Sequence, residues 1–205
     1  MSRRNDYRAE PLAKVLNWSP RIFSFSNFLS VNECDHLIEQ ATPGLARCSV
    51  GYGDSARHIS DARTCFASNL SGSKDKIVKA IEERIARLTF FPASHAEMMH
   101  VIRYEVGQEF RPHHDFYNYV SPSIVGGQRI ATFLMYLNEP EEGGTTEFPV
   151  LKLSVKPKKG SALLFFNTKL DEKSTERDTL HAGTPVIKGH KWVATKWLHN
   201  MPVTS

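Results

Sequence analysis

Short apolar runs separated by Gly and Pro dominate the chain from Met98 onward. They lie at Met99–Val106, Gln128–Leu137, Leu151–Val155, Ser161–Phe166, Thr184–Ile187 and Lys191–His199. Several short strands with turn residues between them are typical of an all-β sandwich or barrel. We therefore predict a β-rich core over residues 98–200.

Two helical patterns precede this core. Ser30 and Glu33 have the spacing of a capping box, which predicts a helix from Val31 that ends at Pro43. Apolar residues spaced three and four apart predict a second helix over 73–89. Shorter runs predict strands at 23–28, 46–50 and 61–67. The pattern is that of a mainly β protein with N-terminal helices.

No polar linker separates the two parts. We expect residues 1–17 to form a polar N-terminal lead-in and residues 18–205 to form a single domain, with helical support over 30–90. A chain of 205 residues with 40% hydrophobic residues is long and apolar enough for one core, which excludes a wholly disordered chain.

Charge and apolar content narrow the classes of partner. The net charge of +4 comes from 26 basic and 22 acidic residues, which is ordinary for a solvated surface, so no nucleic acid is expected. Since no apolar run reaches the roughly 18 residues that a membrane span needs, no membrane association is expected either. We expect a monomer by default.

The cysteines and the N-terminus bear on the compartment. Three cysteines exclude a complete disulfide framework, and the pairing of Cys48 with Cys65 stays open. The first residues contain no apolar stretch of signal-peptide length. The expected location is cytoplasmic if the chain is full length, and the secretory pathway if an N-terminal signal was trimmed.

A potential metal site lies in Pro112-His113-His114-Asp115. In an extended segment side chains alternate faces, so His113 and Asp115 share one face and His114 lies on the other. With His181 as third ligand they would make the facial triad of non-haem Fe(II) oxygenases. A short His-x-Asp is common by chance, and the alternatives are a histidine in a surface turn and a hydrogen-bonded core histidine.

The strand Lys191–His199 adds a cation. One of its faces carries Lys191, Val193, Thr195, Trp197 and His199. If this face is interior, a buried ammonium is costly unless an anion pairs with it. A dicarboxylate co-substrate would supply that anion. The alternative is that Lys191 extends to solvent at the end of the strand.

Together these features resemble the prolyl 4-hydroxylase family of Fe(II)/2-oxoglutarate-dependent dioxygenases. The resemblance runs from about Trp18 to His199. It rests on Trp18-Ser19-Pro20-Arg21, Arg103-Tyr104-Glu105-Val106-Gly107-Gln108, Pro112-His113-His114-Asp115, Gly126-Gly127-Gln128-Arg129, Gly143-Gly144-Thr145-Thr146-Glu147-Phe148, Leu180-His181-Ala182-Gly183 and the run from Lys191 to Trp197.

The resemblance implies a double-stranded β-helix, or jelly roll, with Fe(II) held by His113, Asp115 and His181. It implies that 2-oxoglutarate pairs its distal carboxylate with Lys191, and that Tyr104, Thr146 and Tyr136 contribute to the same pocket. The reaction would be O2-dependent hydroxylation at C4 of a peptidyl proline, with 2-oxoglutarate converted to succinate and CO2 and ascorbate as reductant.

The substrate side is assigned by chemistry and resemblance together. Aromatic side chains suit proline rings, which singles out Trp197, Phe110 and Tyr117. Arg129 and Arg63 are candidates to hold backbone carbonyls. Core packing is the alternative for each aromatic. Two positions depart from the family pattern, because Phe110 and His114 stand where tyrosine is usual.

Three other functions remain open. One is a 2-oxoglutarate oxygenase acting on a lysyl residue, a free amino acid or nucleic acid; Lys191 argues against nucleic acid, where the superfamily usually has arginine. The second is a non-catalytic binding module, which the intact triad disfavours. The third is a zinc hydrolase with the same three ligands, and the metal that supports activity discriminates it.

Overall fold

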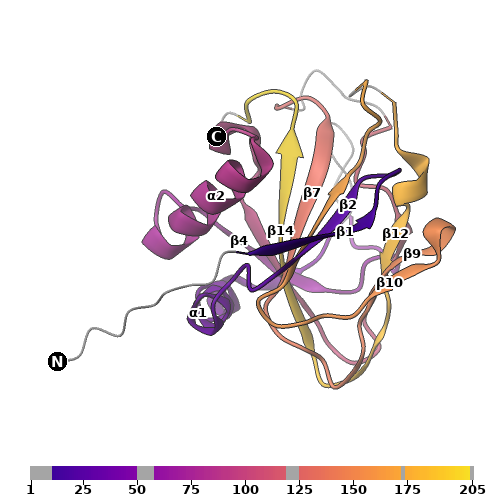
Figure 1. Ribbon diagram of the computed structural model, residues 1–205. Coiled ribbons are helices and arrows are strands. Elements are labelled where there is room, and N and C mark those ends of the chain that lie inside the picture. Colours follow the sequence, from indigo (N-terminus) through magenta and orange to yellow (C-terminus); the bar gives the residue numbers. More distant parts are fainter. Residues whose placement is uncertain (1–10, 50–57, 119–124, 172–173, 204–205) are drawn as a thin grey trace.

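The computed structural model describes residues 11–49, 58–118, 125–171 and 174–203 (Figure 1). The larger sheet contains, in order of pairing, β1 (Leu12–Asn17), β2 (Ile22–Ser26), β11 (Ala162–Phe166), β7 (Arg129–Tyr136), β14 (Lys191–His199), β5 (Met99–Tyr104), β4 (Phe66–Leu70) and β3 (Ala46–Arg47). The smaller sheet contains β10 (Leu153–Val155), β9 (Thr146–Phe148), β12 (His181–Gly183) and β6 (Phe110–His113). A third sheet pairs β8 (Glu142–Gly143) with β13 (Val186–Lys188).

Neighbouring strands in these sheets are antiparallel, and the predicted jelly roll is confirmed. The α-helices are α1 (Val31–Ala41) and α2 (Lys76–Thr89). Short 3-10 turns lie at η1 (Thr42–Gly44), η2 (Ala93–His95), η3 (Pro149–Leu151) and η4 (Arg177–Thr179). The helices lie on one side of the larger sheet, and the smaller sheet lies on its other side (Figure 1).

Side-chain hydrogen bonds determine where both helices begin. The Ser30 hydroxyl accepts from the Glu33 N–H at 3.2 Å, and the Glu33 carboxylate accepts from the Ser30 N–H at 3.0 Å, which confirms the capping box. Helix α2 starts at Lys76, three residues later than predicted, because the Asp75 carboxylate accepts the N–H groups of Ile77 and Val78.

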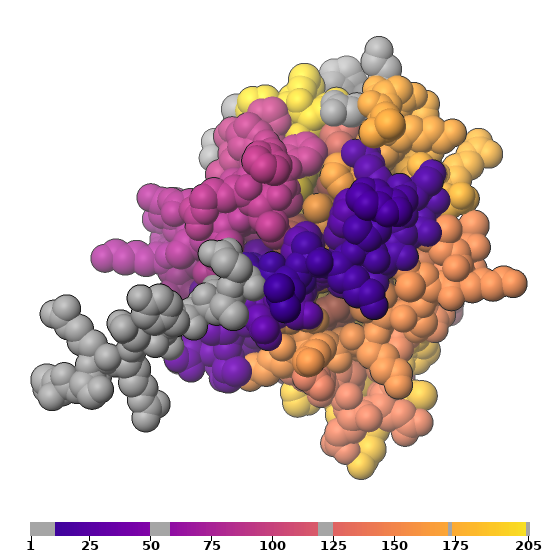
Figure 2. All heavy atoms as spheres, viewed as in Figure 1, coloured from indigo at the N-terminus to yellow at the C-terminus, as the bar shows by residue number. Residues whose placement is uncertain are grey.

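Two apolar cores lie on the two faces of the larger sheet. Alternate residues of β7, such as Phe133 and Met135, pack against α1 and α2, whereas Tyr136 belongs to the cluster between the two sheets. The β1–β2 hairpin (indigo) and helix α2 (magenta) cover much of the face seen in Figure 2. The second cluster forms the interior of the jelly roll, where the functional residues gather.

The N-terminal strand was not predicted. Of the expected lead-in 1–17, residues 1–10 lie outside the described residues, but Leu12–Asn17 form β1 and pair with β2. Most of β1 is exposed, so main-chain hydrogen bonds hold it and no hydrophobic pattern reveals it. The strand predicted at 61–67 lies at Phe66–Leu70, and the one predicted at 46–50 is reduced to Ala46–Arg47, with Val50 outside the described residues.

The cysteine pairing left open by the sequence is present. Cys48 and Cys65 form a disulfide with a Cα–Cα distance of 5.3 Å, and Cys34 is a buried free thiol. Neither helix of the described chain has the length and apolar character to cross a membrane.

Candidate active site

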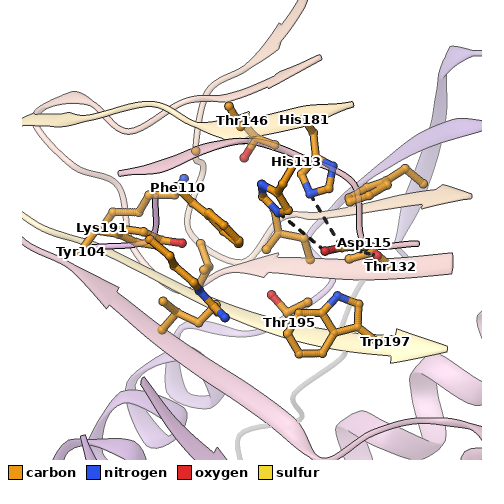
Figure 3. A pocket seen from close by; sticks show the side chains of 17 residues that line it. Tyr104, Phe110, His113, Asp115, Thr132, Thr146, His181, Lys191, Thr195 and Trp197 are labelled. Carbon is orange, nitrogen blue, oxygen red and sulfur yellow. Dashed lines mark hydrogen bonds and ion pairs between the residues drawn. The ribbon is translucent and has the colours of Figure 1, made fainter. Parts of the chain in front are cut away.

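A cavity between the two sheets brings most of the predicted site residues together (Figure 3). His113, Asp115 and His181 lie at one end of it and Lys191 lies near Tyr104 at the other. Thr146 lines the same cavity, as do Phe110, Trp197 and Arg63. Strands from both sheets therefore supply the metal-ligating and the cationic groups.

Strand pairing explains how the metal-ligating cluster forms. His181 of β12 is the antiparallel partner of His113 of β6, and Asp115 follows two residues after His113, on the same face. The His113 Nε2 lies 3.6 Å from Asp115 Oδ1, and the His181 Nε2 lies 3.7 Å from Asp115 Oδ2. The three ligand atoms all lie within 4.8 Å of one another, close enough to share one metal ion.

Main-chain carbonyls orient both imidazoles. The Nδ1 of His113 lies 2.8 Å from the Arg111 carbonyl, and the Nδ1 of His181 lies 3.0 Å from the Thr179 carbonyl. A carbonyl oxygen only accepts, so each Nδ1 carries the proton and each Nε2 directs its lone pair at the cluster. His114 is turned away as predicted, and its Nε2 donates to the Arg177 carbonyl.

The protonation states suit a divalent cation. Burial and the neighbouring His181 lower the pKa of His113 to about 3, so this imidazole is neutral at physiological pH. Burial alone would raise the pKa of Asp115, but His181, His113 and Arg129 outweigh it and hold the pKa below its usual range. Two imidazoles and one carboxylate are the ligand types that fit Fe(II) with positions left for co-substrates. Zinc accepts the same ligand types.

At the other end of the cavity, Lys191 is a basic residue without a carboxylate partner among the described residues. The residue is 3% exposed. Burial lowers its pKa from 10.5 to about 7. The ammonium lies 5.5 Å from the ring centre of Tyr104 and 6.0 Å from that of Tyr136. A buried cation of this kind calls for an anionic ligand.

The predicted partners of that anion fall into two groups. Tyr104 and Thr146 line the cavity, whereas Tyr136 lies behind it. The Tyr136 hydroxyl donates to Thr146 Oγ1 at 2.8 Å, so it orients the threonine rather than facing the cavity. Burial raises the pKa of both tyrosines, so both remain neutral hydrogen-bond donors.

The predicted substrate residues are only partly brought together. Phe110 stacks on His113 with ring centres 3.5 Å apart, and the Arg63 guanidinium lies over Phe110 at 4.9 Å. Arg129 and Tyr117 do not line the cavity. Arg129 is 1% exposed, and its guanidinium forms an ion pair with Glu97. The same guanidinium lies 3.8 Å from the ring centre of Trp197.

Three residues around this site were not predicted from the sequence. Glu97 pairs with Arg129 and His199, which together lower its pKa to about 2 although burial opposes that shift. Thr132 and Asn167 form hydrogen bonds beside Asp115. Thr132 was detectable, because it is adjacent to Phe133 in β7 and therefore points to the opposite face, toward the cavity. Glu97 and Asn167 belong to no motif.

Comparisons with known proteins agree with this geometry. The model of the 2OG-Fe(II) oxygenase superfamily matches residues 99–199. Probable prolyl 4-hydroxylase 3 of Arabidopsis thaliana is 41% identical over 212 residues, which cover 94% of this chain and 74% of the relative. Prolyl 4-hydroxylase 5 of the same plant is 38% identical, with 93% and 72% covered.

A solved structure of a prolyl hydroxylase is also similar to this chain. The viral collagen prolyl hydroxylase of Paramecium Bursaria Chlorella virus-1, in its 2OG complex, has a TM-score of 0.67 and 28% identity, with 86% of this chain and 94% of that chain covered. The ligand set, the buried lysine and these relatives agree on Fe(II) and 2-oxoglutarate. The chain belongs to the prolyl 4-hydroxylase family of 2OG-Fe(II) oxygenases and is a 2-oxoglutarate-dependent dioxygenase.

Proposed function

We propose that this enzyme hydroxylates C4 of proline residues in peptides or proteins, with 2-oxoglutarate and O2 consumed and succinate and CO2 released. One observation carries the proposal: a single cavity holds the His113–Asp115–His181 cluster at one end and the unpaired Lys191 at the other. The names of the relatives, which are prolyl 4-hydroxylases, support proline as the target.

The metal ligands and the buried lysine would bind different parts of the reaction centre. His113, Asp115 and His181 would hold the iron, and the Lys191 ammonium would pair with the distal carboxylate of 2-oxoglutarate. That carboxylate has more acceptor sites than one ammonium fills, and the hydroxyls of Thr146 and Tyr104 are the nearby donors. Bound Fe(II), with O2 and 2-oxoglutarate, supplies the oxidising power that replaces a C–H bond of proline by C–OH.

Other side chains that line the cavity suit a peptide. Phe110 and Trp197 offer aromatic surface for a proline ring. Arg63 is 7% exposed, and its Nε and Nη2 have no hydrogen-bond partner in the described residues, so it can donate to peptide carbonyls. A proline-rich peptide loses little entropy on binding, because its polyproline II conformation is already ordered.

Other expectations accompany this function. Ascorbate would keep the iron reduced, and the enzyme would act as a monomer without nucleic acid. The Cys48–Cys65 disulfide favours an oxidising compartment over the cytoplasm, because disulfides persist where thiols are not continually reduced. This supports the secretory-pathway alternative of the sequence analysis.

The test is mass spectrometry of a proline-rich peptide incubated with the enzyme, Fe(II), 2-oxoglutarate and ascorbate in air. We expect one added oxygen per modified proline, 4-hydroxyproline after hydrolysis, and an equal amount of succinate. A matched peptide with alanine for proline should stay unmodified. Oxygen added to lysine, or zinc-dependent activity without iron, would contradict the proposal.

Two neighbouring histidines provide the matched variants. His113→Ala removes a ligand and should abolish both products. His114→Ala removes the adjacent imidazole, which is turned away from the cluster, and should retain most activity. Equal loss in both variants would contradict the ligand assignment. Succinate without a hydroxylated peptide would keep the oxygenase and reject proline as the target.

A further inference from the structure

The three ligands of the cluster are oriented in two different ways. Main-chain carbonyls hold the two histidines, whereas side chains hold the carboxylate of Asp115. The Thr132 hydroxyl of β7 donates to Asp115 Oδ2 at 2.7 Å. The side-chain amide of Asn167, directly after β11, donates to Thr132 Oγ1 at 3.0 Å. All three residues are buried, with 7%, 2% and 2% exposure for Asp115, Thr132 and Asn167.

The donors and acceptors give this chain one direction. A carboxylate only accepts and a hydroxyl has one proton, so Thr132 commits its proton to Asp115. The amide N–H of Asn167 then occupies a lone pair of the same hydroxyl. The alternative contact, from Thr132 to the Asn167 carbonyl, is longer at 3.5 Å. The bonds therefore run from Asn167 to Thr132 to Asp115.

This arrangement treats the two carboxylate oxygens of Asp115 differently. Oδ1 lies 3.6 Å from His113 Nε2 and Oδ2 lies 3.7 Å from His181 Nε2, but among the described residues only Oδ2 accepts a hydrogen bond, from Thr132. A carboxylate can bind a metal through one oxygen or through both. Binding through both would occupy a further coordination position that the co-substrates need.

We propose that Thr132 and Asn167 are positioning residues that restrict Asp115 to binding the metal through one oxygen. The inference rests on the proposed function, because it assumes that the cluster is a metal centre. Neither residue needs to touch metal, co-substrate or peptide for this role. Removing partners that orient metal ligands typically costs 10–100-fold in metal affinity.

The experiment measures metal binding alone, without substrate. Mn(II) affinity is read from the loss of the free Mn(II) electron paramagnetic resonance signal, and the coordination number from the visible absorption of the Co(II) protein. Thr132→Val keeps the side-chain shape and removes the hydroxyl, Thr132→Ser restores the hydroxyl, and Asn167→Leu removes the amide donor. Thermal unfolding of the metal-free proteins reports changes that are merely structural.

Thr168→Val is the matched control. Thr168 is 1% exposed and adjacent to Asn167, but its hydroxyl is buried without a hydrogen-bond partner in the described part of the chain. The same substitution there removes a hydroxyl without removing a bond. We expect the Mn(II) affinity of Thr168→Val to stay within about threefold of wild type, because Thr168 does not orient a metal ligand.

We expect Thr132→Val to weaken Mn(II) binding by about 10–100-fold and to reduce the Co(II) absorption, since a released carboxylate that binds through both oxygens raises the coordination number. Asn167→Leu should weaken binding less, and Thr132→Ser should restore it. Unchanged affinity and absorption in Thr132→Val, or equal losses in Thr168→Val, would overturn the inference. If this series holds while no proline is hydroxylated, only the proposed function fails.

Discussion

Strand β14 carries two buried lysines on opposite faces, and among the described residues only Lys196 has a carboxylate partner. Lys191 and Lys196 are each 3% exposed. Lys196 faces the helices and pairs with Glu82 of α2 at 2.7 Å. Lys191 faces the cavity and has no carboxylate partner in the described residues. The same residue type thus serves structure on one face and ligand binding on the other.

The pKa values reflect the same difference. Burial lowers the pKa of both ammonium groups, but the negative charge of Glu82 opposes the shift at Lys196. Burial acts without opposition on Lys191 and lowers its pKa to about 7. A buried charge without a partner is costly to the fold, and a protein retains it where a ligand provides the partner. The comparison therefore distinguishes a binding cation from a structural one.

Replacing Lys191 gives the largest expected effect on co-substrate binding. Lys191→Met keeps the length of the side chain and removes its charge. Loss of one partner of a buried charge pair costs about 2–5 kcal/mol, so the KM for 2-oxoglutarate should rise by at least about 30-fold. Folding stability should stay equal or increase, because a costly charge is gone. A large drop in Tm with an unchanged KM for 2-oxoglutarate would show that Lys191 stabilises the fold and does not bind the co-substrate.

The matched variant on the other face should behave in the opposite way. Lys196→Met leaves the Glu82 carboxylate without its partner. Since that carboxylate is partly exposed, we expect a loss of about 2 kcal/mol in the free energy of unfolding, measured by urea titration, with less than a twofold change in KM. Adding Glu82→Leu should recover most of the loss. A raised KM for 2-oxoglutarate would show that the two faces are not independent.

A pH series sharpens the comparison further. The ligand-free Lys191 loses its proton above about pH 7, and only the charged form pairs with a carboxylate. The dissociation constant of 2-oxoglutarate should rise up to tenfold per pH unit above 7, measured by titration calorimetry with Mn(II) present. Lys191→Arg should flatten this rise, because guanidinium remains charged. An affinity that increases with pH would contradict the assignment.

The ionisation of Lys191 should also affect folding stability, which should increase with pH where the affinity for 2-oxoglutarate decreases. The pKa of Lys191 is lower in the folded protein than the usual 10.5, so between about pH 7 and 10.5 the unfolded chain binds a proton that the folded chain does not. The contribution of Lys191 to the free energy of unfolding therefore increases with pH in this window. Lys191→Met should remove that contribution.

The smallest predicted effect concerns Tyr136. Its hydroxyl donates to Thr146, which lines the cavity, whereas Tyr136 itself does not line it. Tyr136→Phe removes one neutral hydrogen bond of about 0.5–1.5 kcal/mol, so the KM for 2-oxoglutarate should rise by about 2–10-fold. Thr146→Val removes the group that lines the cavity itself and should have the larger effect. The reverse order would place the Tyr136 hydroxyl in direct contact with the co-substrate.

The cavity-facing residues of β14 and two of the metal ligands could be predicted, because side chains in an extended segment alternate between two faces. Lys191, Thr195 and Trp197 line the cavity as alternation predicts, and Lys196 lies on the other side. His113 and Asp115 share a face for the same reason. His181 could be nominated from its position at a strand edge, but its pairing with His113 is a long-range contact that only the fold shows.

Other features left no local pattern. Arg129 was assigned to the substrate because its partner Glu97, which lies 32 positions away, could not be inferred from the sequence. Asn167 lies in a bend directly after β11, and the register of β11 against β7 brings it to Thr132. Strand β1 is held mainly by main-chain hydrogen bonds, which side-chain patterns do not report. Such contacts depend on tertiary packing.

The most direct test of the central claim is a crystal structure of the enzyme with Mn(II) and 2-oxoglutarate, prepared without oxygen. We expect a distal carboxylate oxygen about 2.7–2.9 Å from the Lys191 Nζ, with the metal held by His113, Asp115 and His181. A 2-oxoglutarate whose distal carboxylate pairs with Arg63, while Lys191 makes no contact with it, would show that Lys191 is not the binding cation.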